Sequence, residues 1–183
     1  MSVALSIATG LALAAAAGFR AFVPLLAAGL AIHFGYVEAS PGFAWLGEPI
    51  VLVALGVATA TEIAAYYVPG VDHVLDLIAT PVAVATGIIA AAGVMVGLPD
   101  WLRWLTAIGA GGAVTTAGHA LSAVGRAKTG VATGGLGNPV YSTAELAGSV
   151  LLAIFAFLLP LIALVAAMAI GLFLLQRWRR RRV

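Results

Sequence analysis

The sequence contains no cysteine, and only 9% of its residues are charged. Without cysteine the chain can form no disulfide and has neither a thiolate metal ligand nor a cysteine nucleophile. Charge is scarce because 63% of the residues are hydrophobic, and the mean hydropathy is +1.12. This composition argues against a soluble domain. Long runs of Ala, Leu, Val and Ile separated by short Gly, Pro and charged breaks predict helices that cross a bilayer.

We therefore expect an all-α, polytopic transmembrane helical bundle of about six spans. An integral membrane domain fills residues 1–176, and a basic tail occupies 177–183. No Lys or Arg precedes Arg20, so the first apolar run is interpreted as a retained span and not as a cleaved signal peptide. The apolar run after residue 146 is too long for one ~30 Å crossing, and Pro160 divides it. The predicted spans are 3–32, 50–68, 72–96, 101–125, 140–159 and 160–175.

The distribution of charge predicts the orientation of these spans. Arg126 and Lys128 follow the fourth span, and five arginines follow the sixth. With six spans both groups lie on one side, which the positive-inside rule assigns to the cytoplasm. Both termini are then cytoplasmic, in the plasma (inner) membrane. The tail would attract anionic lipid headgroups, although a plain role in setting the topology is the simpler interpretation. The acidic residues Glu38, Glu48 and Asp100 lie on the other side.

Arg20 is the first candidate for a functional residue, because a cation inside an apolar span costs at least a few kcal/mol unless it faces a wet or polar interior. Pro24 follows it by four residues and removes a helical hydrogen bond to its carbonyl, so we expect a kink there. An arginine that snorkels to the headgroups is the alternative. Arg20 lies about 25 Å along the helix from Val3, nearer the outer face than the acidic residues described next. If the helix breaks, Arg20 can lie at the same depth as these residues. If it does not break, Arg20 forms a second constriction or binds a substrate anion between the two levels.

Four spans carry an ionisable residue within about 10 Å of the cytoplasmic boundary, at 1.5 Å of rise per residue. Polar residues at helical spacing flank each of them. Four polar faces at one depth predict a shared polar cavity that binds a substrate or an ion. Many of the flanking Thr and Ser residues fit helix packing equally well. The predicted site residues, with Arg20, are Glu62, Asp76, His119, Glu145, Thr59 and Thr115.

The second and third spans resemble the fourth and fifth in their arrangement. Glu62, a Pro-Gly turn and Asp76 correspond to His119, a Gly-Asn-Pro turn and Glu145. This weak internal repeat consists of two-helix units that run in the same direction. Duplicated units with a site between them are typical of transporters.

Three segments resemble a known family. They are GFRAFVPLLAAGLA in the first span, the run from Glu62 through VPGVDHVLD, and GNPVYSTAELAGS. They resemble a family of small bacterial membrane proteins, domain of unknown function 4126, over nearly the whole chain to about Met168. Members often carry adjacent Glu and Asp in the penultimate span, where this chain has Ala144 and Glu145. The resemblance implies a helical membrane protein and no particular activity.

Three functions compete. The first is a small transporter or channel for a proton, cation or small polar solute, with His119 as a proton relay. It is expected to be a homo-oligomer, since so few spans rarely enclose a pathway alone. The second is a structural or accessory subunit of a membrane complex. The third is a membrane-embedded enzyme, which is least favoured, with Glu62, Asp76, His119 and Glu145 as candidate ligands for a divalent metal. No pattern indicates nucleic-acid binding, and the cofactor is unknown.

Overall fold

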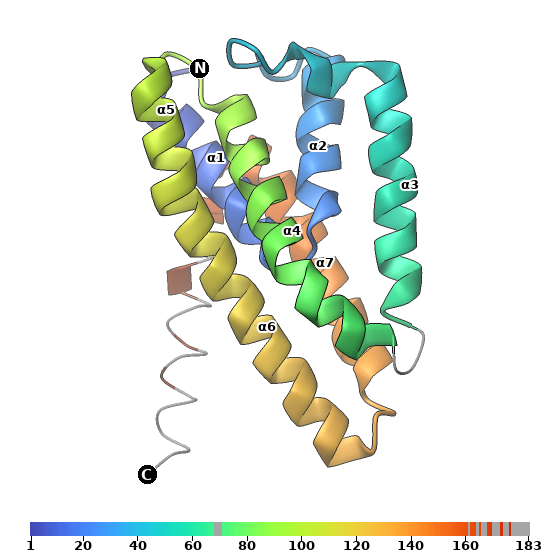
Figure 1. The fold of residues 1–183 in the computed structure, drawn as a ribbon. Coiled ribbons are helices and arrows are strands. Elements are labelled where there is room, and N and C mark those ends of the chain that lie inside the picture. The colour runs from blue at the N-terminus through green and yellow to red at the C-terminus, as the bar shows by residue number, and fades with distance from the viewer. Residues whose placement is uncertain are drawn as a thin grey trace.

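The computed structural model is helical and contains no strand over the residues that it describes (Figure 1). These are 1–67 and 71–160, together with 162, 163, 165, 168, 169, 173 and 176, and only the backbone is described for 71–77. The predicted site residue Asp76 therefore has its side chain outside the described part. The tail 177–183 and most of the predicted span 160–175 lie outside it as well.

The described chain folds into helices that are joined by short connections, with one long helix formed from three consecutive segments. In that helix α5 passes without interruption into a π-helical turn, η2, and then into α6. The elements are α1 (Val3–Ala17), α2 (Phe22–His33), the 3₁₀ helix η1 (Ala44–Gly47), α3 (Pro49–Ala65), α4 (Val71–Val94), α5 (Asp100–Thr106), η2 (Ala107–Gly111), α6 (Gly112–Thr133) and α7 (Asn138–Leu158).

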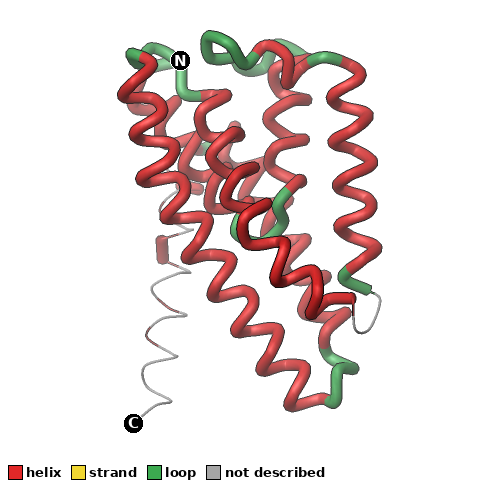
Figure 2. Tube along the Cα trace, in the orientation of Figure 1, coloured by secondary structure: helices red, strands yellow, loops and turns green. Residues whose placement is uncertain are grey.

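The predicted first span, 3–32, is not one helix. It consists of α1 and α2, which are separated by residues 18–21. The break comes before Pro24, which lies in the first turn of α2, where a missing amide proton removes no helical hydrogen bond. The expected kink at Pro24 is therefore wrong, because the helix has already ended at Ala17. Figure 2 shows the α1–α2 connection in green within the molecule, away from both of its ends.

Helix α1 forms the centre of the bundle. Every residue from Ala12 to Ala17 is buried, and the helix contacts α2, α4, α6 and α7. The sequence in this stretch is almost entirely alanine, and such small side chains let neighbouring helices approach closely on every side. A segment predicted as one full crossing is therefore a short, enclosed helix.

The N-terminus lies at the end of the molecule that holds Glu38, Glu48 and Asp100, which we call the acidic end (Figure 1). There the Ser6 hydroxyl donates to the carbonyl of Val96 at 3.0 Å. From this end α1 runs inward and α2 returns, so that the pair forms a helical hairpin. Helices α3 and α4, and likewise α6 and α7, are antiparallel pairs that turn at the opposite end. The two pairs run in the same direction, as the predicted two-helix repeat requires.

The long helix extends beyond the predicted fourth span, 101–125. It continues to Thr133, so that Arg126 lies within a helix and not in a loop, and only 2% of it is exposed. By length and composition, one helix in the described part of the chain, α7, is able to cross a membrane. Helices α1, α2 and α3, and residues 78–94 of α4, are apolar but shorter.

Candidate charged site at the helix break

The break between α1 and α2 puts Arg20 inside the bundle, where only 1% of the residue is exposed. The end of α1 contacts α6 at two glycines. A Cβ atom on Gly18 would lie 3.0 Å from the Cα of Gly118 and 3.1 Å from the amide nitrogen of His119. These are backbone atoms with little freedom to move, so glycine at this position permits the close contact. The chain turns there and directs Arg20 toward α7.

Arg20 contacts two groups on α7 and the Tyr66 ring, which directly follows α3. Its Nη2 atom donates to the carbonyl of Ser142 at 2.9 Å and lies 3.7 Å from Oε2 of Glu145. Its guanidinium carbon lies 4.1 Å from the centre of the Tyr66 ring. The cation is thus stabilised by a carboxylate, a carbonyl and an aromatic face, which are the kinds of partner that a buried arginine requires.

Arg126 reaches the same carboxylate and the same ring from α6. Its Nη2 atom lies 3.1 Å from Oε1 of Glu145, and its guanidinium carbon lies 4.3 Å from the Tyr66 ring centre. The Ser122 hydroxyl donates to Oε1 of Glu145 and accepts a hydrogen bond from Arg126 at 3.3 Å. Glu145 is therefore shared between two arginines, and all three charged side chains are buried. We call Arg20, Tyr66, Ser122, Arg126 and Glu145 the charged cluster.

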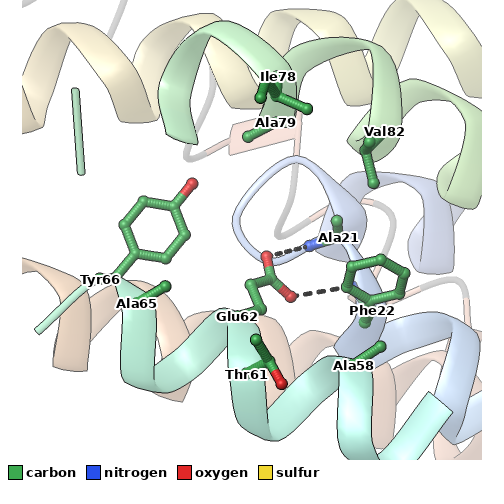
Figure 3. Close-up of a pocket in the computed structure, with 10 residues that line it drawn as sticks. All are labelled: Ala21, Phe22, Ala58, Thr61, Glu62, Ala65, Tyr66, Ile78, Ala79 and Val82. Carbon is green, nitrogen blue, oxygen red and sulfur yellow. Dashed lines mark hydrogen bonds between the residues drawn. The ribbon is translucent and has the colours of Figure 1, made fainter. Parts of the chain in front are cut away.

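Glu62 lies beside the charged cluster and caps a helix. Its two carboxylate oxygens accept hydrogen bonds from the backbone amides of Ala21 at 2.8 Å and Phe22 at 3.1 Å (Figure 3). These amides belong to the first turn of α2, where they have no partner within the helix and where the helix dipole is positive. A carboxylate supplied by α3 therefore stabilises the start of α2 and fixes the position of the break.

The remaining predicted site residues differ in their surroundings. Thr115 packs α6 against α1, since its hydroxyl lies 2.7 Å from the carbonyl of Ala14 and 3.0 Å from that of Gly111. Thr59 has no hydrogen-bond partner for its hydroxyl among the described residues. His119 is buried on α6, one turn before Ser122. Of the predicted set, the structure brings Arg20 and Glu145 into an ion pair, with Glu62 beside them.

Arg126 belongs to the charged cluster but was not among the predicted site residues, because the fourth span was expected to end before it. A signal for it exists. Thr115, His119, Ser122 and Arg126 follow one another at intervals of four, three and four residues, which is the spacing of one helical face. All four are buried. Extending the polar face of the fourth span by one turn would have placed Arg126 beside Glu145.

The metal-site hypothesis receives no support from the part of the chain that the structure describes. No three His, Asp or Glu side chains there are grouped so that they could hold a metal ion. The Glu145 carboxylate is next to two guanidinium groups, both within 4.0 Å. Two neighbouring positive charges disfavour a divalent cation at this carboxylate.

The fold and this cluster define a class. It is a helical protein in which the chain breaks between α1 and α2 inside the bundle, and ion-paired side chains lie at this break. The chain belongs to the family described as domain of unknown function DUF4126, whose model matches residues 7–180. The resemblance predicted from the sequence is thereby confirmed. No curated protein and no solved structure matches the chain.

Proposed function

We propose that the protein is an integral membrane protein, because its polarity is reversed relative to a soluble protein. Large apolar side chains are exposed along α3 and α7, including Ile50 at 79%, Val57 at 62% and Leu151 at 53%. Arg20, Arg126 and Glu145 are each at most 4% exposed. Exposed apolar faces around buried charges match a protein that is surrounded by hydrocarbon.

In the orientation that we propose, the end opposite the acidic end faces the cytoplasm of a cell bounded by the plasma (inner) membrane. Lys128 and the basic tail 177–183 favour this side, and the tail would contact anionic lipids. The prediction of a cytoplasmic N-terminus depends on a single first span. With α1 and α2 as a hairpin, the same rule assigns the N-terminus to the outside.

Within this membrane protein, we propose a transporter or channel for a proton, cation or small polar solute, acting as a homo-oligomer. The observation that supports it best is the meeting of two half-length helices at the charged cluster. In many transporters, discontinuous helices end at mid-membrane, and their ends and the adjacent side chains form the substrate site. Here the end of α1, the start of α2, Arg20 and Glu145 are together within the bundle.

The chemistry of the charged cluster supports a mechanism by exchange. A proton or cation that reaches Glu145 competes with Arg20 and Arg126 for the same carboxylate. Binding therefore weakens two ion pairs at once, and these pairs link the α1–α2 connection, α6 and α7. Since each guanidinium also lies against Tyr66, its displacement would alter the contact with α3. Occupancy of one carboxylate would thus change how four elements pack.

Reconstituted liposomes provide the test. Purified protein is incorporated into liposomes that contain a dye sensitive to H⁺, Na⁺ or K⁺, and a gradient of the matching ion is applied in each case. We expect a protein-dependent flux that Glu145→Gln and Glu62→Gln abolish and Asp100→Asn leaves unchanged. Size-exclusion profiles establish that each variant is folded. Folded wild-type protein that conducts none of the three ions would overturn the proposal for protons and metal cations, and folded Glu145→Gln protein with undiminished flux would overturn the role of the charged cluster.

A structural or accessory subunit is the second candidate, and a specific observation favours it. Glu62 uses both carboxylate oxygens to cap α2, and the Ser149 hydroxyl donates to the carbonyl of Ala16 at 3.0 Å. Contacts of this kind stabilise a membrane bundle without any substrate. Wild-type protein that is folded, gives no flux and copurifies in fixed ratio with another membrane protein would favour this function.

A further inference from the structure

A cavity of about 340 Å³ lies between the start of α2, the second half of α3 and the middle of α4. Pockets for small molecules span about 300–1,000 Å³, so this one suits a compact ligand. Figure 3 shows Glu62 and Tyr66 on its α3 side, opposite Ile78, Ala79 and Val82 of α4. The residues lining it are Ala21, Phe22, Ala58, Thr61, Glu62, Ala65, Tyr66, Ile78, Ala79 and Val82.

The cavity exists because α3 stands off the bundle. No residue of α3 itself is buried, and Tyr66 directly after it is only 4% exposed. Alanines at 58, 65 and 79 leave space where larger side chains would join the two helices. Most of the lining is apolar, so a ligand must have an apolar body to gain from leaving water or lipid headgroups.

The polar atoms of the lining select the other part of the ligand. Glu62 as a carboxylate has no donor, and each of its oxygens retains a lone pair beyond its backbone bond. Thr61 already donates its hydroxyl proton to the carbonyl of Val57 at 2.8 Å, so it is left as an acceptor. Glu62 makes no ion pair within 4.0 Å among the described residues, in contrast to Glu145. The wall therefore favours a ligand that brings donors and positive charge.

We propose that this cavity binds small molecules with an apolar body and a protonated amine, and that the ammonium group is held by Glu62. The inference rests on the proposed function, because it names the class of cation that the site would take. A lipophilic ammonium ion gains a charge-assisted hydrogen bond from the carboxylate and apolar contact from the surrounding alanines, Phe22, Ile78 and Val82. Tyr66 lines the cavity, and its ring centre lies 4.1 Å and 4.3 Å from the guanidinium carbons of Arg20 and Arg126. A ligand that contacts this ring would therefore affect the charged cluster.

A matched set of ligands tests the selectivity. The probes are ring-fluorinated 4-phenylbutylamine, 4-phenylbutanol and 4-phenylbutyrate, which share one apolar body. Binding is measured by ¹⁹F NMR with the protein in neutral-lipid nanodiscs, and empty nanodiscs correct for partition into lipid. We expect the amine to bind roughly tenfold or more tightly than the alcohol, and the carboxylate to show no saturable binding. Equal binding of the three would mean that the cavity accepts any apolar tail, and would overturn the inference.

Two variants locate the binding. Glu62→Gln removes the charge and should reduce amine affinity to that of the alcohol. Ala65→Phe fills the cavity while leaving the carboxylate in place, and should abolish saturable binding. Its matched control is Ala64→Phe, at a neighbouring exposed position of α3, which should bind as the wild type does. Loss of binding in Ala64→Phe, or retention in Ala65→Phe, would place the amine elsewhere and contradict the inference.

The flux assay separates this inference from the proposed function. Saturable, Glu62-dependent amine binding in a protein that conducts neither the three ions nor the amine itself would support the cavity and overturn the transport proposal. Proton or metal-cation flux in a protein that fails to bind the amine would support transport and overturn the amine site. Each proposal can therefore fail alone.

Discussion

Two buried arginines at different levels of the molecule use opposite means of compensating their charge. Arg103, at the acidic end, is 3% exposed and pairs at 2.9 Å with Asp100, whose side chain is 76% exposed. Arg20, at the helix break, pairs with Glu145, whose side chain is 3% exposed. Arg103 also lies near the Phe43 ring, at 5.7 Å, much as Arg20 lies against Tyr66. The arginines are alike, and their carboxylates differ in access to water.

This difference predicts how far each charge depends on its partner. If Asp100 is neutralised, its exposed position leaves the ion pair open to water, and water can replace the lost partner of Arg103. If Glu145 is neutralised, two guanidiniums are left inside the protein without their shared counter-charge. The contacts of Arg103 stabilise a loop at the edge of the bundle. Those of Glu145 make the position of three helices depend on one carboxylate.

The largest effect is expected from Glu145→Gln. It should lower the free energy of unfolding by about 3–5 kcal/mol, the usual cost of removing one partner of a buried ion pair. The measurement is SDS-induced unfolding from mixed micelles, followed by circular dichroism. A loss below about 1 kcal/mol would mean that the charged cluster is hydrated, and that the contrast with Arg103 is absent.

The close contact at the helix break gives the second prediction. Gly18→Ala introduces a Cβ atom 3.0 Å from the Cα of Gly118, and we expect a loss of about 1–3 kcal/mol because backbone must move. Gly148→Ala on α7 is the control. A Cβ atom there meets nothing within 4 Å, so the variant should gain up to about 1 kcal/mol from helix propensity. The same unfolding assay applies, and equal effects in the two variants would contradict the observed packing.

A smaller effect is expected where a hydroxyl joins two helices. Thr115→Val removes the contact between α6 and the carbonyl of Ala14 and should cost about 1 kcal/mol in thermal or SDS unfolding. Thr116→Val is the matched control, since the Thr116 hydroxyl donates to Gly112 of its own helix and the residue is exposed. A larger loss for the control would reverse the assignment of the two faces of α6.

The smallest effect is expected from Asp100→Asn, the same chemical change as Glu145→Gln applied to the exposed partner. The expected loss is about 0–1 kcal/mol, as for other ion pairs with a solvent-exposed member. A double variant with Glu145→Gln should lose the sum of the two, since the sites are far apart along the bundle. If Asp100→Asn costs as much as Glu145→Gln, exposure of the carboxylate does not determine the difference.

Composition and polar spacing were sufficient to predict the helical class, most helix positions and the place of Arg20 in a polar interior. They were insufficient to distinguish one long helix from two short ones over 3–32. Alanine and leucine form both equally well, and the residues that cause the break act through tertiary contacts. Gly18 makes room for Gly118, and Glu62 supplies a cap from forty residues away. Neither relation is visible in local sequence.

The partners of Glu145 were missed for a related reason. The fourth span was predicted to end at Gly125, with Arg126 after it on the cytoplasmic side, whereas α6 continues beyond Arg126. Tyr66 and Ser122 are among the polar residues that flank Glu62 and His119 at helical spacing, but this spacing does not show that both contact Arg126. Their shared role depends on how α3, α6 and α7 pack against one another, and this packing cannot be deduced from the spacing of residues within one helix.

The central position of α1 has a consequence for biogenesis. Its residues are synthesised before those of α4, α6 and α7, yet they pack against these three helices. In the membrane protein that we propose, α1 and α2 are too short to be ordinary spanning helices, so the hairpin would stay at the membrane surface, or in a factor that shields it, until its neighbours had been inserted. The innermost part of the bundle would therefore be the last to reach its place, and the entry of Arg20 would complete the fold.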